Sequence, residues 1–180
     1  LSDILASVDI NTEQKIKFNS MKVEVEESLD SMLSYTFTIK NENHTIGNLI
    51  SEYCKLMYCI NEEELQPGQV KHEGDLLDFA SYRMPHPLKE EVEIKLNLHK
   101  GVDCKSLYND MCNKISKTDR VTDPNDIKLE LVKLLFIKTV AFIIETTENM
   151  TEQLKILNGI NNPSFEIQDE HDFTDINKLI

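Results

Sequence analysis

Alternating apolar and polar residues mark three segments of the chain as strands. The clearest segments are 34–40 and 91–99, where every second residue is aromatic or aliphatic, and 76–84 is a weaker third example. Alternation with a period of two is typical of a strand with one buried face. The predicted buried positions in the two clearest strands are Tyr35, Phe37, Ile39, Val92, Ile94, Leu96 and Leu98.

From Thr45 the apolar residues follow a helical period instead. They fall three and four positions apart, as expected for one stripe of an amphipathic helix, and either Asn43 or Thr45 can cap its start. The members of this stripe are Ile46, Leu49, Ile50, Tyr53, Cys54 and Met57.

Two further helices are predicted in the second half of the chain. Residues 103–115 form a short helix, and Asp123-Pro124 is an N-cap followed by proline in the first helical position. The helix that begins there can run to about Leu157, before Asn158-Gly159 offers a stop.

The middle of this last helix is apolar on nearly all sides. Of the 14 residues from Leu131 to Ile144, 11 are apolar, which is too short a run to cross a bilayer because spanning takes about 20 residues. A helix of this kind needs cover on more than one side, and one small sheet covers only one. We therefore expect a partner surface here. The alternative is that the N-terminal arm and the 103–115 helix supply the cover within the chain.

The order of these elements predicts an α+β fold. It is a two-layer arrangement with helices on one face of a small, mainly antiparallel sheet. Residues 1–33 are assigned to an N-terminal arm, in which 14–26 form a hairpin or an extended segment. Residues 34–158 form the domain, and 159–180 form an acidic tail.

Charge and cysteine content narrow the classes of function. The chain has 19 Lys and Arg against 32 Asp and Glu, a net charge of −13, which disfavours broad nucleic-acid binding and favours a basic protein partner. The four cysteines contain no CxxC pair, so reduced thiols of an intracellular protein are expected rather than a zinc site. The start lacks both a signal-peptide pattern and an initiator Met, so we expect a processed or trimmed chain, or part of a longer one.

No set of residues predicts catalysis, a cofactor or a metal. His44 and Thr45 are neighbours on a helix, so their side chains diverge and do not form a base and nucleophile pair. Gly47 lacks the glycine-rich loop of a phosphate site, and His86 has no second ligand at a suitable spacing. The acidic stretches do not follow a calcium-loop pattern. Gly47 is better explained as a position where another backbone, here predicted to be that of another chain, approaches closely.

Two motifs taken together resemble a known family. The stretch Asn43 to Asn48, "NHTIGN", opens the first helix, and "YRMPHPL", with Tyr82, Pro85, His86 and Pro87, lies between two strands. This combination is similar to the small alpha-like subunits of archaeal and eukaryotic RNA polymerases, which include archaeal subunit L and the eleventh subunit of polymerase II. Asn43 stands where that family usually has an acid. The resemblance covers about residues 14–100, and 123–157 by helix pattern alone.

The resemblance implies a non-catalytic assembly subunit of a multisubunit DNA-directed RNA polymerase. Such a chain forms a heterodimer with a larger alpha-like subunit, on which the catalytic subunits assemble, and it makes little contact with nucleic acid. The interface would use the first and last helices. The implied interface residues are Ile46, Gly47, Leu49, Ile50, Tyr53, Leu131, Leu134, Leu135, Lys138 and Phe142.

The chain departs from the family in three places. Residues 61–75 lengthen one loop, 101–122 insert a helix, and the acidic tail is additional. These features suggest a divergent polymerase, viral or protist, or the second half of a fused alpha-like chain. The location would be the nucleus of a eukaryote, or the virion or host cytoplasm for a virus. The alternative function is a homodimeric α+β module that binds a ligand or regulates a partner.

Overall fold

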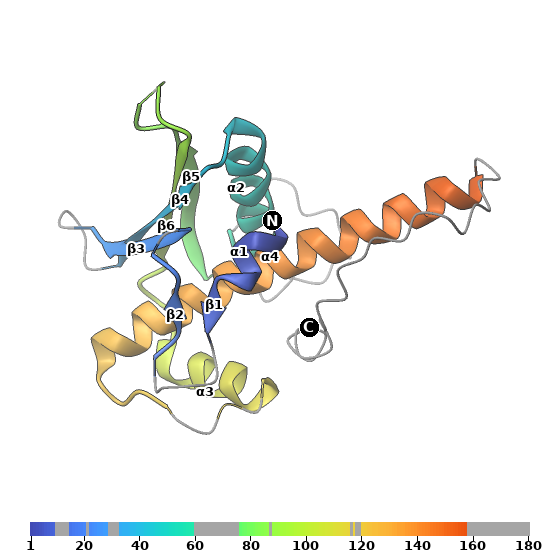
Figure 1. Cartoon of the computed structure of the whole chain (residues 1–180). Coiled ribbons are helices and arrows are strands. Elements are labelled where there is room, and N and C mark those ends of the chain that lie inside the picture. Colours follow the sequence, from blue (N-terminus) through green and yellow to red (C-terminus); the bar gives the residue numbers. More distant parts are fainter. Residues whose placement is uncertain are drawn as a thin grey trace, which may run out of the picture.

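The computed structural model describes residues 1–9, 15–20, 22–28, 33–59, 76–86, 88–115, 117 and 120–157. A four-stranded antiparallel sheet forms one layer (Figure 1), with the strand order β3-β4-β6-β5. Its strands are β3 (Val23–Glu27), β4 (Ser34–Lys40), β5 (Leu77–Arg83) and β6 (Glu91–Leu98).

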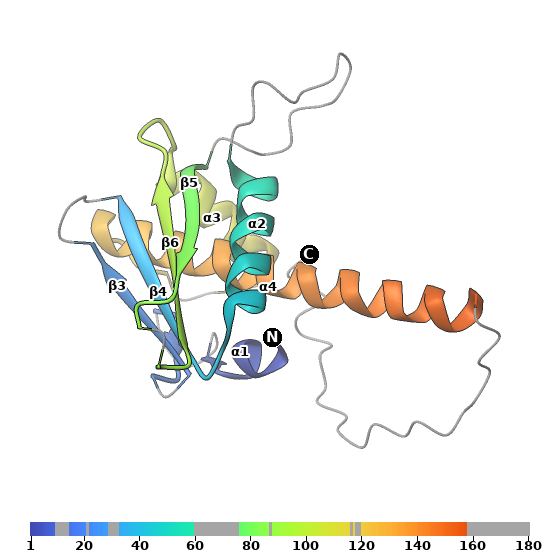
Figure 2. The same ribbon diagram turned by 90° about the horizontal axis from the view of Figure 1, so that it is seen from above.

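Helices pack against one face of this sheet, as Figure 2 shows from above. The four helices are α1 (Ser2–Ala6), α2 (His44–Tyr58), α3 (Cys104–Lys114) and α4 (Pro124–Leu157). A separate small ladder joins β1 (Val8–Asp9) to β2 (Lys17–Phe18). The predicted α+β fold, with a first helix and a long last helix on a small antiparallel sheet, is confirmed.

The buried face of the sheet is the one that the alternation predicted. Tyr35, Phe37 and Ile39 are all buried, and the ring of Phe37 stacks on that of Phe136 from α4, with centroids 4.3 Å apart. In β5 a bulge between Leu77 and Phe79 interrupts the pairing. This irregularity explains why the sequence pattern of β5 is weaker than that of its neighbours.

The N-terminal segment divides between the sheet and a separate arm. β3 pairs with β4 and so extends the sheet, although it lies within the segment 1–33 that the sequence assigned to an arm. β2 pairs with β1, a strand that the sequence did not predict, and not with β3. Of the hairpin and the extended segment that the sequence left open for 14–26, the hairpin is therefore ruled out.

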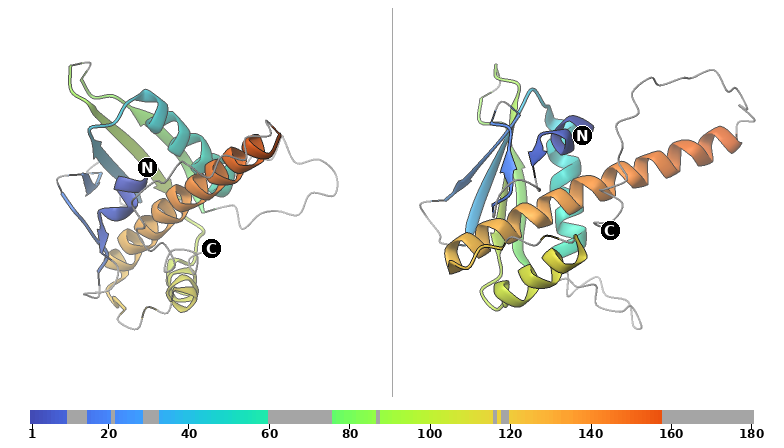
Figure 3. Two further views of the ribbon diagram at one scale, coloured as in Figure 1. Left: turned by 45° about the vertical axis from the view of Figure 1, so that its right-hand side comes forward. Right: turned by 60° about the horizontal axis from the view of Figure 1, so that its bottom comes forward.

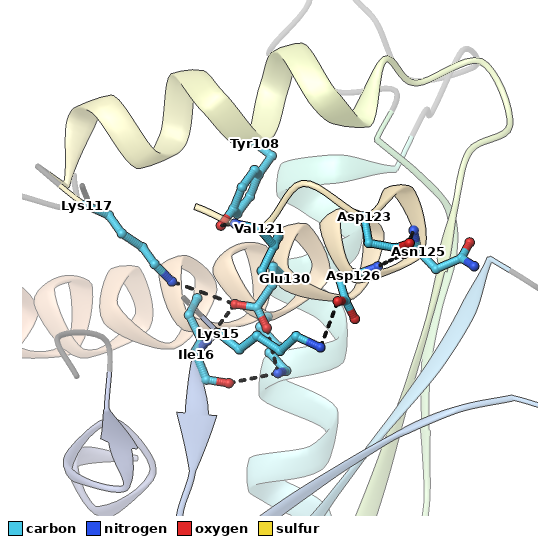
Figure 4. Close-up of polar contacts among 10 residues, drawn as sticks. Lys15, Ile16, Tyr108, Lys117, Val121, Asp123, Asn125, Asp126 and Glu130 are labelled. Carbon is cyan, nitrogen blue, oxygen red and sulfur yellow. Dashed lines mark hydrogen bonds and ion pairs between the residues drawn. The ribbon is translucent and has the colours of Figure 1, made fainter. Parts of the chain in front are cut away.

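Two charged side chains of α4 hold the arm in place (Figure 4). The backbone N–H of Ile16 donates to Glu130 Oε2 at 2.6 Å, and Lys133 Nζ donates to the carbonyl oxygen of Ile16 at 2.8 Å. Lys133 also donates to Glu130 Oε1 at 2.8 Å, and Lys117 Nζ lies 3.8 Å from Glu130 Oε2. All three charged side chains are buried. The arm is thus bound through its backbone at one defined residue.

The apolar first half of α4 is covered by the chain itself. Residues 131–137 are buried, with α1, α2 and α3 all packing on this helix. Buried side chains come from the arm as well, including Ile4 and Ile16. For residues 131–137 the expected partner surface is therefore wrong, because the arm and α3 supply the second side of their cover.

The long last helix begins at its predicted cap. Asp123 Oδ1 accepts the backbone N–H of Asn125 at 2.9 Å, and Asp103 caps α3 in the same way by accepting from Ser106 at 3.1 Å. The second half of α4 extends beyond the rest of the fold in both views of Figure 3. The predicted stop at Asn158-Gly159, the 61–75 loop and the 159–180 tail lie outside the described residues. No helix in the described part of the chain is long and apolar enough to cross a membrane.

Candidate functional site

The start of α2 is fixed by one amide side chain. Asn43 Oδ1 accepts the backbone N–H of Thr45 at 2.9 Å and that of Ile46 at 3.4 Å. Its backbone is extended, as an N-cap requires. Of the two caps that the sequence left open, the structure uses Asn43. Thr45 and Asn48 lie exposed in the first turns of the helix.

Gly47 brings the helix against its own sheet. A Cβ built at this position would lie 2.4 Å from Val92 Cγ1 and 2.8 Å from Tyr82 Cδ2, and real Cβ atoms essentially never come so close. The ring of His44 meets the edge of Tyr82, with centroids 6.1 Å apart. The expectation that Gly47 touches another chain is wrong, because the glycine is buried against β5 and β6 of the same chain. The two sequence motifs meet at this junction.

The turn after β5 has a local structural role. His86 Nδ1 accepts the backbone N–H of Leu88 at 3.1 Å, and the carbonyl oxygen of His86 accepts that of Lys89 at 3.2 Å. Pro85 and His86 are exposed, and Pro87 lies outside the described residues. The described residues hold no group of three or more His, Cys, Asp or Glu side chains that could bind a metal. The histidine therefore has a hydrogen bond that orders the turn.

The predicted single stripe on α2 is divided between two faces. Ile50 and Cys54 are buried against the sheet and α4, and so are Gly47 and Tyr58. The remaining apolar residues form an outer face that is only partly covered. Its members are Ile46, Leu49, Tyr53, Leu56 and Met57. Leu56 is 71% exposed, so the described part of the chain leaves this outer face open.

The outer face of α2 continues onto α4. The rings of Tyr53 and Phe142 lie 5.9 Å apart, and both side chains are only partly buried. Beyond them, the projecting part of α4 exposes Met150 and Leu154 to 59% and 56%. We call this combined area the α2–α4 surface. It comprises Ile46, Leu49, Tyr53, Leu56, Lys138, Phe142, Met150 and Leu154.

Half of the residues predicted for a partner interface do not reach this surface. Leu131, Leu134 and Leu135 are buried inside the chain, as are Ile50 and Gly47. They are not part of the α2–α4 surface, so the expectation that all ten predicted residues form one exposed interface is wrong. The sequence reasoning had also left out the exposed residues further along α4. Their spacing of four within a predicted helix was a usable signal.

The most informative relatives are RNA polymerase subunits. The chain is 31% identical over 102 residues to the DNA-directed RNA polymerase II subunit rpb11 of Dictyostelium discoideum, a match that covers 48% of this chain and 71% of the relative. It is 38% identical over 79 residues to the probable DNA-directed RNA polymerase II subunit RPB11 of Plasmodium falciparum, covering 44% of this chain and 48% of that protein. No family model matches the chain.

The chain belongs to the RPB11 family. This relationship confirms the resemblance to small alpha-like polymerase subunits that the two motifs indicated. In this RPB11-family chain, the motifs form the junction of α2 with the sheet. They therefore position α2, and the outer face of the helix, rather than the motif glycine, is what a partner can reach.

The cysteines of this RPB11-family chain are not activated. Burial raises the pKa of the Cys54 thiol to about 12, and burial also raises the pKa values of Cys59, Cys104 and Cys112. A nucleophilic cysteine needs a lowered pKa so that the thiolate is present at neutral pH. Cys54 instead contacts Thr139 Oγ1 at 3.6 Å within the α2–α4 packing. All four cysteines are free thiols.

Proposed function

We propose that the chain is a non-catalytic assembly subunit of a multisubunit DNA-directed RNA polymerase, and that it acts by pairing with a larger alpha-like subunit through the α2–α4 surface. Membership of the RPB11 family carries the first part of the proposal. The resulting heterodimer would be the unit on which the catalytic subunits assemble. The eukaryotic polymerase II relatives support a nuclear location, and nothing in them supports a viral one.

The open apolar face carries the second part. Large exposed apolar patches commonly mark protein interfaces, and this one joins α2, which packs on the sheet, to α4, which packs on α2. Its centre is the pair Tyr53 and Phe142, whose rings already touch. Aromatic residues at the centre of a patch are typical binding hot spots. The net charge of −13 makes direct nucleic-acid contact a minor part of this role.

Co-expression with the larger alpha-like subunit of the same organism tests the pairing. Light scattering after size exclusion should report one copy of each chain. Tyr53→Lys should abolish the complex without lowering the melting temperature by more than a few degrees, because the side chain is only partly buried. Asn48→Lys, exposed on the same helix but outside the surface, is the matched control. If the chain alone forms a stable homodimer and does not bind the alpha-like subunit, the result would support the alternative function as a homodimeric module.

A further inference from the structure

A pocket of about 300 Å³ lies beside α3 and the first half of α4. Its base is apolar and comes from three helices and the residue before β5. The apolar lining residues include Tyr58, Leu76, Leu107, Met111, Leu134 and Leu135. Around them lie the polar side chains of Asp110, Asn113, Lys114 and Lys138. This combination of an apolar base and a few polar groups is typical of a binding pocket.

The wall formed by α3 is firmly held. Tyr108 and Cys112 anchor the helix because both are buried against the rest of the chain. Arg120 closes the end of the helix through hydrogen bonds to Asn109 and Asn113. Leu107 and Met111, one turn apart, are only partly buried, since they face the pocket. One apolar side of α3 is thus buried against the rest of the chain, and a second apolar side faces the pocket.

The charge at the mouth differs from that of the whole protein. Two positively charged side chains, Lys114 and Lys138, and one negatively charged side chain, Asp110, line the pocket. The chain as a whole, by contrast, carries a net charge of −13. Within the described residues neither lysine has an ion-pair partner, although Lys55 and Lys133 each contact a glutamate. Two ammonium groups beside an apolar pocket suit a ligand that combines an apolar side chain with a carboxylate.

The pocket is continuous with the α2–α4 surface. Lys138 belongs to both, and it precedes by one helical turn Phe142, whose ring touches that of Tyr53. A chain that binds across Tyr53 and Phe142 therefore lies about one helical turn from Lys138 at the pocket.

We infer that this pocket receives an acidic and apolar segment of the larger alpha-like subunit. One bulky apolar side chain of the partner fills the base, and an Asp or Glu beside it pairs with Lys114 and Lys138. The inference rests on the proposed function and extends the interface to α3, which lies in the segment 101–122 where this chain departs from the family pattern. The acidic tail of the chain itself, residues 159–180, is the competing occupant, and a crosslink from position 111 within the chain would identify it.

Photo-crosslinking in the co-expressed complex tests this assignment. The full-length chain carries p-benzoyl-phenylalanine in place of Met111, or in place of Lys105 as a matched control, since Lys105 is exposed on α3 and does not line the pocket. Irradiation should join position 111, and not position 105, to the larger alpha-like subunit. The crosslinked peptide should hold a bulky apolar residue within two positions of an Asp or Glu.

Charge reversal gives a second and independent readout. Lys114→Glu should weaken binding of the larger subunit roughly two- to fivefold, the effect of one exposed ion pair, and it should lower the yield of the crosslink at position 111. Lys105→Glu should change neither. Both lysines are exposed on α3, but Lys105 lies in its first turn and Lys114 in its last. Lys114→Glu should therefore melt at a slightly lower temperature than Lys105→Glu, because an acid opposes the helix dipole at the C-terminus.

The outcomes separate this inference from the proposed function. If the unmodified chains do not form a complex, both proposals fail. If they do, but position 111 crosslinks to its own chain, to a different polymerase subunit or to nothing, the pocket assignment alone is overturned.

Discussion

The backbone of Gly47 and the side chain of Val92 lie so close together that no Cβ fits between them. An ideal Cβ on residue 47 would lie 2.4 Å from Val92 Cγ1. The ring of Tyr82 lies 2.8 Å away from the same Cβ, so a shift of the Cβ away from Val92 is blocked as well. Glycine costs roughly 1 kcal/mol relative to alanine inside a helix. Here that cost is offset by the close packing of α2 on β5 and β6, which sets the position of the outer face of the helix.

Gly47→Ala should therefore destabilise the chain even though alanine is the better helix former. Crowding in a packed core costs typically about 1–3 kcal/mol, which exceeds the gain in helix propensity. Urea unfolding should show a lower free energy of unfolding. Asn48→Ala, at the next and exposed position, should show no such loss. Val92→Ala is itself destabilising because the side chain is buried. The double variant should lose less stability than the sum of the two single losses, and purely additive effects would contradict the close-contact explanation.

The buried carboxylate of Glu130 supports a second prediction. It accepts the N–H of Ile16 and balances the buried ammonium groups of Lys133 and Lys117. Glu130→Gln keeps the shape but leaves both ammonium groups without a counter-charge. Removing one partner of a buried ion pair typically costs about 3–5 kcal/mol.

Two measurements would check that prediction. The free energy of unfolding of Glu130→Gln should fall by that amount, while Glu145→Gln, exposed on the same helix, should leave it unchanged. Hydrogen exchange of the Ile16 amide should also become faster in Glu130→Gln. Unchanged protection of this amide would mean that the arm is held by its apolar contacts and not by the carboxylate.

The local pattern was enough to predict most of the elements, because a strand or helix periodicity is a property of consecutive residues. The strand 34–40 has the predicted bounds, and the caps at Asn43 and Asp123 are contacts between near neighbours. The hydrogen bond from Ile16 to Glu130 joins residues 114 positions apart, and no pattern among neighbouring residues predicts it.

The candidate site was harder to predict than the fold for a related reason. A missing Cβ at Gly47 indicates close approach but not what approaches, and the structure assigns that place to Val92 rather than to another chain. Likewise, an apolar stripe along a helix does not show which of its residues the sheet will bury. Ile50 was grouped with Leu49, yet it is fully buried while Leu49 remains partly open.

Alkaline pH should destabilise the fold through buried groups that ionise more easily when unfolded. Burial is the largest cause that raises the pKa of Tyr35 well above its usual range, and the charges of Glu27 and Cys104 act in the same direction. Burial likewise raises the pKa of Cys54 to about 12.

Because the folded-state pKa of each group is raised, its contribution to stability is complete below the ordinary pKa of that group and is lost as the pH rises above it. The loss begins near pH 9 for the thiol and near pH 10 for the phenol, and each group contributes about 1.4 kcal/mol per pH unit. In Tyr35→Phe the decline above pH 10 should be shallower, whereas below pH 9 the curves should run parallel.

The projecting end of α4 gives the last prediction, which separates binding from folding on a single helix. Leu154 is 56% exposed, whereas Leu134 is buried on the same helix. Leu154→Lys should weaken binding of the larger alpha-like subunit and leave the melting temperature unchanged, because a lysine at this position remains in water in the free chain. Leu134→Lys should instead unfold the chain, since it would bury a charge without a partner. Thermal melting of the free chain and titration with the larger subunit would measure the two effects separately. If Leu154→Lys bound as tightly as the unaltered chain, the interface would be restricted to α2 and the part of α4 around Phe142.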